Sequence, residues 1–211
     1  MKTMKWAMMA VLASAVAPGQ NYEVGGVAGA GFLSGANVSG GGGSATTGFK
    51  SGPAFGGVVG HNLYPHLSGE VRYGYLMSDL KLSSGGNQAS FNGMAHVLHY
   101  DLLIHPNRRG SKVQPFVAAG GGMKLFRGTG KEAAYQPLNE FAYLTRTGEV
   151  KPMISVGAGA KVTVAPNVLV RVEFRDYITP FPKEVIAPAP GAKISGWLHH
   201  FVPLVGISFT F

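Results

Sequence analysis

The sequence predicts an all-β fold: an eight-stranded antiparallel up-and-down transmembrane β-barrel preceded by a signal peptide. Three observations carry this prediction. Eight long segments alternate apolar with small or polar residues, the connections between them are alternately long and short, and no apolar run of about 18 residues follows residue 21. The 211 residues suffice for one all-β domain and are too few for two. We therefore expect a signal peptide over residues 1–20 and one transmembrane β-barrel domain over residues 21–211.

The N-terminus has the three parts of a secretory signal peptide. Lys2 and Lys5 form a basic start, an apolar run extends from Trp6 to Leu12, and small residues follow from Ala13. The alternative is an uncleaved membrane anchor, but that would need an apolar run of roughly 20 residues, and this run is shorter. We expect cleavage between about residues 15 and 20.

The eight segments are each about 10 to 16 residues long and are bounded by Gly, Pro, Asn and Ser. This length exceeds the usual five or six residues of a globular strand and suits a tilted strand that crosses a bilayer. Successive side chains of a strand point to opposite faces, so Val170, Val172 and Phe174 oppose Arg171 and Glu173. The predicted strands cover residues 22–33, 49–61, 67–78, 91–104, 113–126, 150–163, 167–178 and 197–211.

The connections between these segments alternate in length. Residues 34–47, 79–90, 127–149 and 179–196 form long connections, whereas a joint such as "APN" is short. Membrane barrels show this asymmetry, with short turns on the periplasmic side and long loops outside the cell. We expect the four long connections outside the cell, with the stretch "SGGGGSATTG" as a flexible loop.

The alternation fits two kinds of barrel, a soluble one with the apolar face inside and a membrane barrel with the apolar face outside. The polar face is rich in Gly and Ala, as a narrow eight-stranded lumen requires. Charges of opposite sign, such as Glu70 and Arg72, lie close together along it, and aromatic residues near the segment ends suggest the girdles of a membrane barrel. These features favour the membrane barrel. The expected girdle residues are Tyr22, Phe32, Phe49, Tyr64, Phe91, Phe126, Tyr177, Phe181 and Trp197.

Four stretches carry a resemblance to a known family. They are "GEVRYGYLMSD" (69–79), "VQPFVAAGGGMKLF" (113–126), "VRVEFRDYITP" (170–180) and "GISFTF" (206–211). They resemble the small eight-stranded outer-membrane β-barrels of Gram-negative bacteria, the family of OmpA-type transmembrane domains and opacity-like surface proteins. The resemblance covers essentially all of residues 21–211.

This resemblance implies a porin-like surface protein that is integral to the outer membrane and in contact with its lipid and lipopolysaccharide. In that family, a terminal Phe preceded by alternating apolar residues is read by the outer-membrane assembly machinery. The resemblance thus assigns an assembly signal to Val205, Ile207, Phe209 and Phe211.

Charged residues on the polar faces are candidates for a network in the lumen. Buried charges must be paired, so they form either a salt-bridged plug or a selectivity filter, and pairing in so narrow a barrel favours the plug. Candidate binding residues are Tyr135, Phe141 and Tyr143, which lie in a connection of 23 residues. The predicted lumenal charge network comprises Glu70, Arg72, Asp101, Lys124, Lys161, Arg171, Glu173 and Arg175.

No catalytic, cofactor-binding or metal-binding residues are predicted. The chain has no cysteine, and among its seven histidines only His99, with Asp101, suggests a site. The pair of His99 and Asp101 should face the periplasmic half of the lumen, where we favour a structural hydrogen bond over a catalytic role. We expect His199 and His200 at the membrane interface. The formal charge of +8 is scattered, so nucleic acid is not an expected partner.

These observations together predict a monomeric, non-enzymatic outer-membrane protein with a structural or surface-interaction role, through adhesion or binding by its long extracellular loops. The ligand is unknown. Two alternatives stay open: a small-solute channel, and an outer-membrane lipid-modifying enzyme such as a hydrolase or acyltransferase.

Overall fold

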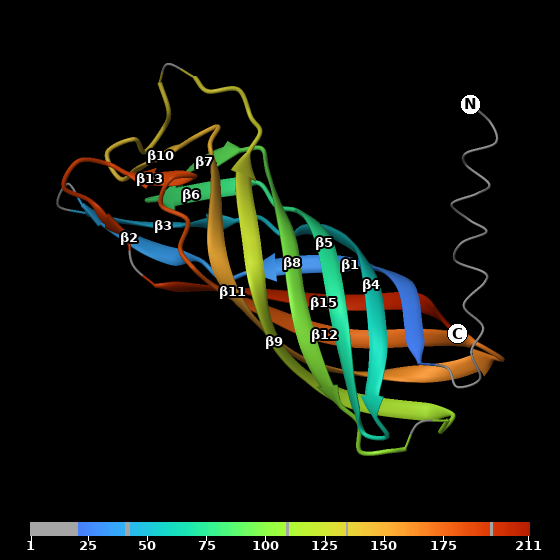
Figure 1. Ribbon diagram of the computed structural model, residues 1–211. Helices are drawn as coiled ribbons and strands as arrows, with labels where there is room; N and C mark the ends of the chain where they lie inside the picture. The colour runs from blue at the N-terminus through green and yellow to red at the C-terminus, as the bar shows by residue number, and fades with distance from the viewer. Residues whose placement is uncertain (1–20, 41–42, 109, 134, 195) are drawn as a thin grey trace, which may run out of the picture.

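A computed structural model shows the fold of the chain (Figure 1). It describes residues 21–40, 43–108, 110–133, 135–194 and 196–211, so the predicted signal peptide lies outside the described residues. The described residues form fifteen β-strands. None of them belongs to a helix that is long and apolar enough to cross a membrane. The all-β prediction is therefore confirmed.

Eight of the strands close into an antiparallel barrel, as predicted. Each barrel strand pairs with the barrel strands that precede and follow it in the chain, which gives an up-and-down topology. The three short joints turn the chain at one end of the barrel, which we call the turn end. The barrel strands are β1 (Tyr22–Leu33), β4 (Gly52–Tyr64), β5 (Leu67–Met77), β8 (Gly93–Ile104), β9 (Val113–Gly128), β11 (Gly148–Ala165), β12 (Val168–Pro180) and β15 (Trp197–Thr210).

The last strand closes the barrel against the first. Val24 of β1 lies opposite Phe209 of β15, and the register continues to Leu33 opposite His200. At the turn end of this pair, Tyr22 and Phe211 exchange two backbone hydrogen bonds of 3.1 Å each. Closure leaves no barrel strand with an unpaired edge, which a strand within lipid requires.

The faces of the barrel have the sense expected of a membrane protein. Val205, Ile207 and Phe209 on β15 point outward and are more than half exposed, at 58%, 53% and 57%. The lumenal side chains of Arg171 and Arg175 on β12 are fully buried, at 0% exposure. Apolar side chains thus cover the outside, where lipid solvates them, and charges lie inside.

The four long connections fold into two further sheets at the other end of the barrel (Figure 1). We call these sheets and the residues between their strands the cap. The expectation of a flexible loop at "SGGGGSATTG" is wrong, because strands lie on both sides of Gly41 and Gly42, which are outside the described residues. The cap contains a five-stranded sheet of β14 (Lys193–Ile194), β2 (Ala36–Gly40), β3 (Gly43–Phe49), β6 (Leu80–Ser84) and β7 (Asn87–Phe91), and a pair of β10 (Ala142–Leu144) and β13 (Ile186–Pro188).

One apolar core joins the cap to the upper half of the lumen. Val97 and Val202 in the barrel belong to the same buried cluster as Leu80 and Leu82 in the cap. The connections are ordered because each cap strand buries an alternate row of apolar side chains in this core. The charged half of the lumen lies below it, toward the turn end.

The aromatic girdle is smaller than predicted. Tyr22, Phe32, Tyr64 and Trp197 point outward and are about half exposed or more, at 49% to 67%. The other five aromatic residues are buried, because strand alternation turns them inward and the cap supplies an apolar core above the lumen. These five are Phe49, Phe91, Phe126, Tyr177 and Phe181.

Candidate functional site

Eight charged side chains meet in the half of the lumen nearest the turn end. Four are cations and four are anions, so the formal charge of this cluster, which we call the lumenal network, sums to zero. Seven of them were predicted from the sequence, and Glu23 of β1 was not. The network consists of Arg72, Lys161, Arg171 and Arg175 with Glu23, Glu70, Asp101 and Glu173.

Glu70 of β5 is the centre of the lower part of the network. Its carboxylate lies 2.8 Å from Lys161 Nζ, 3.0 Å from Arg171 Nη2 and 3.1 Å from Arg72 Nη1. Glu23 completes this layer, since it accepts hydrogen bonds from Lys161 at 2.6 Å and from Arg171 at 3.1 Å. Four different strands therefore contribute to one set of ion pairs across the lumen.

Glu173 of β12 is the centre of the upper part. It accepts two hydrogen bonds from Arg72, one of them at 3.0 Å. It accepts two more from Arg175, at 3.1 Å and 3.0 Å. The remaining Nη1 of Arg175 donates to Asp101 at 2.6 Å, which connects the network to β8.

Two glycines on β11 leave room for these long side chains. A Cβ atom at Gly157 would lie 2.5 Å from Arg175 Cδ, and one at Gly159 would lie 2.8 Å from Glu173 Cβ. Both distances are shorter than non-bonded carbon atoms adopt. The glycine-rich sequence of this strand thus reflects close approach in a narrow barrel.

The charged groups of the network are buried. Glu70, Arg171 and Arg175 are 0% exposed, so their charged groups meet one another and not a water column. A cavity of about 260 Å³ opens at the turn end and reaches Glu23 and Lys161. Above it lie the paired side chains, followed by the apolar core.

Lys124 was predicted in the network, but the structure places it elsewhere in the lumen. Its Nζ atom lies 2.8 Å from Nδ1 of His200 and 4.7 Å from the ring centre of Phe126. His200 is 1% exposed, so the expectation that it lies at the interface is wrong; strand alternation points it inward. Lys124 and His200 lie nearer the cap because they come from the cap ends of β9 and β15.

His99 and Asp101 face the lumen as predicted and form a hydrogen bond of 2.9 Å. Ser155 of β11 donates a hydrogen bond to the other oxygen of Asp101 at 3.3 Å. The serine contacts the aspartate and not the histidine, so the three do not form a nucleophile and base pair. All three are buried within the lumen. In the described ranges no three His, Cys, Asp or Glu side chains are grouped as a metal site.

His199 lies on the lipid-facing wall close to the cap. Its Nδ1 atom lies 2.7 Å from Asp176, and its ring stacks on Phe201 at 5.9 Å. Trp197, two residues earlier, is 57% exposed and belongs to the aromatic girdle. His199 therefore lies at the edge of the apolar band, where a polar pair costs little.

The three candidate binding residues in the longest connection differ in exposure. Tyr135 is 72% exposed and Tyr143 is 40% exposed, so both are accessible from the outside. Phe141 is buried in the apolar core of the cap, which contradicts its selection as a contact residue. It supports the cap from within.

The four residues of the predicted assembly signal form the outer face of the closing strand. Val205, Ile207 and Phe209 point outward, and Phe211 stacks on Tyr22 with ring centres 6.3 Å apart. This places the terminal aromatic side chain on the outer surface at the turn end. Its role in assembly stays a prediction.

Glu23 is the network member that sequence reasoning missed. It is the only charged residue in "YEVGGVAGAGFL", so no neighbour of opposite sign marks it. Its position relative to Gly25 and Val27 could have identified it, because alternation puts all three on the lumenal face. The second missed feature is the polar cleft on the outer face of the cap, whose described lining residues include no charged side chain that would draw attention to it.

A closed antiparallel barrel with an apolar outside and ion pairs inside defines an integral membrane barrel. Residues 6–186 match the outer membrane protein beta-barrel domain, so the chain belongs to this family. It is an integral protein of the outer membrane of a Gram-negative bacterium. No curated protein sequence is significantly similar to it.

Solved structures share the fold at low sequence identity. The N-terminal β-barrel domain of Pseudomonas aeruginosa OprF is 16% identical, with a TM-score of 0.51, over 92% of this chain and 99% of that one. Neisserial surface protein A is 14% identical, also with a TM-score of 0.51, over 92% and 98% of the two chains. OprG from Pseudomonas aeruginosa is 10% identical, with a TM-score of 0.53, over 90% and 96%. These similarities show the fold alone.

Proposed function

We propose that this outer-membrane barrel is a non-enzymatic surface protein that acts by adhesion or binding through its cap. The observation that carries the proposal is the folded state of the long connections. They form two sheets on one apolar core instead of separate loops. A rigid surface of this kind binds a partner with little loss of conformational entropy.

The lumen supports this proposal because its described charged side chains, and the pair of His99 and Asp101, are buried. The lumenal network fills the barrel near the turn end, which disfavours a small-solute channel. His99 and Asp101 are buried within the lumen, which disfavours a lipid-modifying enzyme built on them. Function then resides on the outer surface, where the cap presents exposed polar side chains.

We further propose that the protein is a monomer and that the assembly machinery of the outer membrane reads its last strand. Closure of the barrel supports a monomer, since no barrel strand has an edge that needs a second copy. The exposed apolar row ending at Phe211 supports recognition of the last strand. Outer-membrane lipid and lipopolysaccharide would surround the remaining wall.

The orientation can be tested with single-cysteine variants, because the chain has no cysteine of its own. Lys131→Cys places a thiol on the exposed surface of the cap, and Asn107→Cys is the matched control at the turn end. On intact cells, a membrane-impermeant maleimide should label Lys131→Cys and should label Asn107→Cys only after lysis. The reverse pattern would put the cap in the periplasm.

The same variants test the binding role. Purified protein is assayed for adhesion to host cells and for capture of envelope components. Attaching a polyethylene glycol maleimide to Lys131→Cys should abolish binding by covering the cap, whereas attaching it to Asn107→Cys should leave binding intact. If the unmodified protein bound nothing, or if both modified variants bound equally, the proposed function would be wrong.

A further inference from the structure

The five-stranded sheet of the cap has a polar outer face with an open cleft of about 490 Å³. The cleft exists because strand alternation sends Val38, Ala45 and Leu82 into the core and leaves the intervening side chains outside. Those side chains are hydroxyls and amides. The lining includes Asn37, Ser39, Ser44, Thr46, Ser83 and Gln88.

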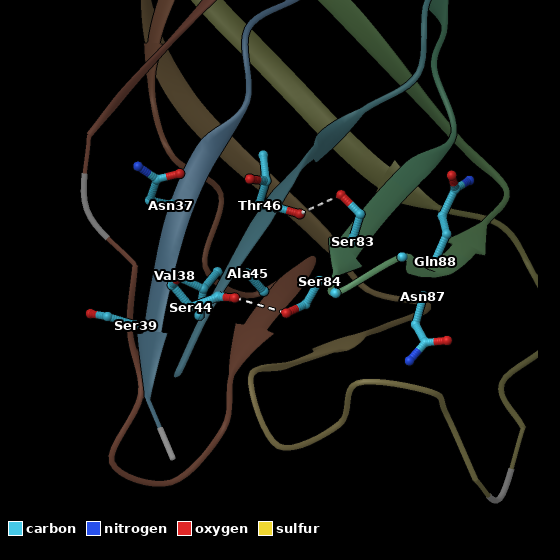
Figure 2. Close-up of a pocket in the computed structure, with 12 residues that line it drawn as sticks. Asn37, Val38, Ser39, Ser44, Ala45, Thr46, Ser83, Ser84, Asn87 and Gln88 are labelled. Atoms are coloured by element: carbon cyan, nitrogen blue, oxygen red, sulfur yellow. Dashed lines mark hydrogen bonds between the residues drawn. The ribbon is translucent and has the colours of Figure 1, made fainter. Parts of the chain in front are cut away.

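Four of these side chains form a row across four strands. Asn37 of β2 lies opposite Thr46 of β3, Thr46 lies opposite Ser83 of β6, and Ser83 lies opposite Gln88 of β7. Neighbouring strands are about 4.8 Å apart, so the row is about 14 Å long. Figure 2 shows the longer Asn37 and Gln88 at its two ends and the shorter Thr46 and Ser83 between them. Because the two middle side chains are short, the surface is lower between Asn37 and Gln88 than at either of them.

Most of the hydrogen-bonding capacity of this row faces outward. Ser83 Oγ donates a long hydrogen bond of 3.5 Å to the backbone oxygen of Thr46. The side chains of Asn37, Thr46 and Gln88 make no hydrogen bond to any other residue that the structure describes, and all three are exposed. An amide or hydroxyl side chain both donates and accepts, so the row presents both kinds of group to a ligand.

The chemistry of the lining selects an uncharged partner. None of the described residues that line the cleft is charged, although the chain carries a formal charge of +8. Lys81 and Lys193 lie at its margins, in register with Ser90 and Ser39. We propose that the cleft binds an uncharged oligosaccharide, whose hydroxyls match the amides and hydroxyls of the row. This inference rests on the proposed function of the cap as a binding surface.

The same lining sets the expected strength of binding. No aromatic side chain is among the described lining residues, so a sugar ring has nothing to stack on and hydrogen bonds must supply the affinity. Neutral hydrogen bonds contribute little each in water, so we expect a dissociation constant of about 1 mM. Several copies of the protein on one cell would raise the avidity of such a weak site for a repeating glycan.

The test uses full-length mature protein in detergent micelles and ligand-observed NMR. The probes are uncharged tri- and tetrasaccharides of glucose, galactose, mannose and N-acetylglucosamine, with sulfated and sialylated oligosaccharides beside them. The variant Thr46→Val with Ser83→Ala removes two hydroxyls at nearly constant volume. Ser90→Ala is the matched control, since Ser90 lies on the same polar face outside the cleft. Heat-modifiable migration on a gel verifies that each variant is folded.

At least one uncharged oligosaccharide should bind to the wild type and to Ser90→Ala, and the double variant should bind it about tenfold or more weakly. Binding of charged oligosaccharides only, binding that the double variant leaves unchanged, or no binding of any oligosaccharide would overturn the inference. If the cap still bound cells or an envelope protein in those cases, the proposed function would survive without the oligosaccharide site. Loss of all binding by the cap would remove both.

Discussion

Glu173→Gln perturbs the lumenal network at the carboxylate with the most hydrogen bonds. Glu173 accepts hydrogen bonds from Arg72, Arg171 and Arg175, and it is 3% exposed. Glutamine has nearly the same shape, so the packing of the lumen should persist. The substitution removes one negative charge and turns an NH₂ group toward the guanidinium groups.

The expected cost follows from the charge balance. Four buried cations would face three anions, which leaves one positive charge without a partner in a closed lumen. Breaking a buried ion pair from one side typically costs about 3 to 5 kcal/mol. Adding Arg72→Met restores neutrality, so the double variant should lose less stability than the sum of the two single variants, by about 1 to 3 kcal/mol.

The free energy of unfolding can be measured by urea titration of protein folded in phospholipid vesicles. Trp197 is the only tryptophan in residues 21–211 and lies on the lipid-facing wall, so its fluorescence reports release from the membrane. Glu140→Gln removes an exposed carboxylate in the cap and serves as control, with an expected change within about 0.5 kcal/mol.

Two results would contradict a tightly coupled, buried network. A cost below about 1 kcal/mol for Glu173→Gln would mean that water or counter-ions reach the network and screen its charges. Additive effects in the double variant would mean that Arg72 and Glu173 do not depend on each other, contrary to their direct contact.

Three further predictions concern the barrel wall and the cap. Gly159→Ala should destabilise the barrel by about 1 to 3 kcal/mol in the same urea assay, because the added Cβ would press on Glu173. Gly26→Ala should be neutral, since only one atom lies within 4 Å of its Cβ position. Equal effects of the two substitutions would contradict the close packing at Gly159. Phe211→Ser should reduce assembly into the outer membrane of cells more than it reduces stability after refolding in detergent, and equal losses would contradict a sorting role. Leu82→Ala leaves a cavity in the core of the cap, so it should speed amide hydrogen exchange in β2, β3, β6 and β7 but not in β11 and β12. Uniform acceleration would mean that cap and barrel unfold as one unit.

The barrel was predictable from sequence because membrane crossing imposes a strict pattern. Val205, Ile207 and Phe209 must face lipid, so their alternation with Gly206 and Ser208 fixes strand, face and closure together. The lumenal charges were predictable for the same reason: Arg171, Glu173 and Arg175 alternate with valine and phenylalanine on one strand. Glu23 was missed because its partners, Lys161 and Arg171, come from strands far along the chain.

The cap was not predictable because its order depends on tertiary contacts. Residues 34–47 read as a glycine-rich flexible stretch, yet Val38 and Ala45 pack into a core formed with Leu80 and Leu82 from another connection. Local sequence cannot show that two such connections meet. The same limit explains Phe141, whose aromatic ring suggests a contact surface in isolation but fills the core once the cap is assembled.

We propose that paired charges close the lumen and that the protein acts through its outer surface. Single-channel recording of the purified wild-type protein in planar bilayers distinguishes a closed lumen from an open one. We predict no stable conductance steps, because Glu70, Arg171 and Arg175 fill the lumen and hold one another in place. Stable, large conductance steps from the purified protein would contradict the closed lumen and favour the channel.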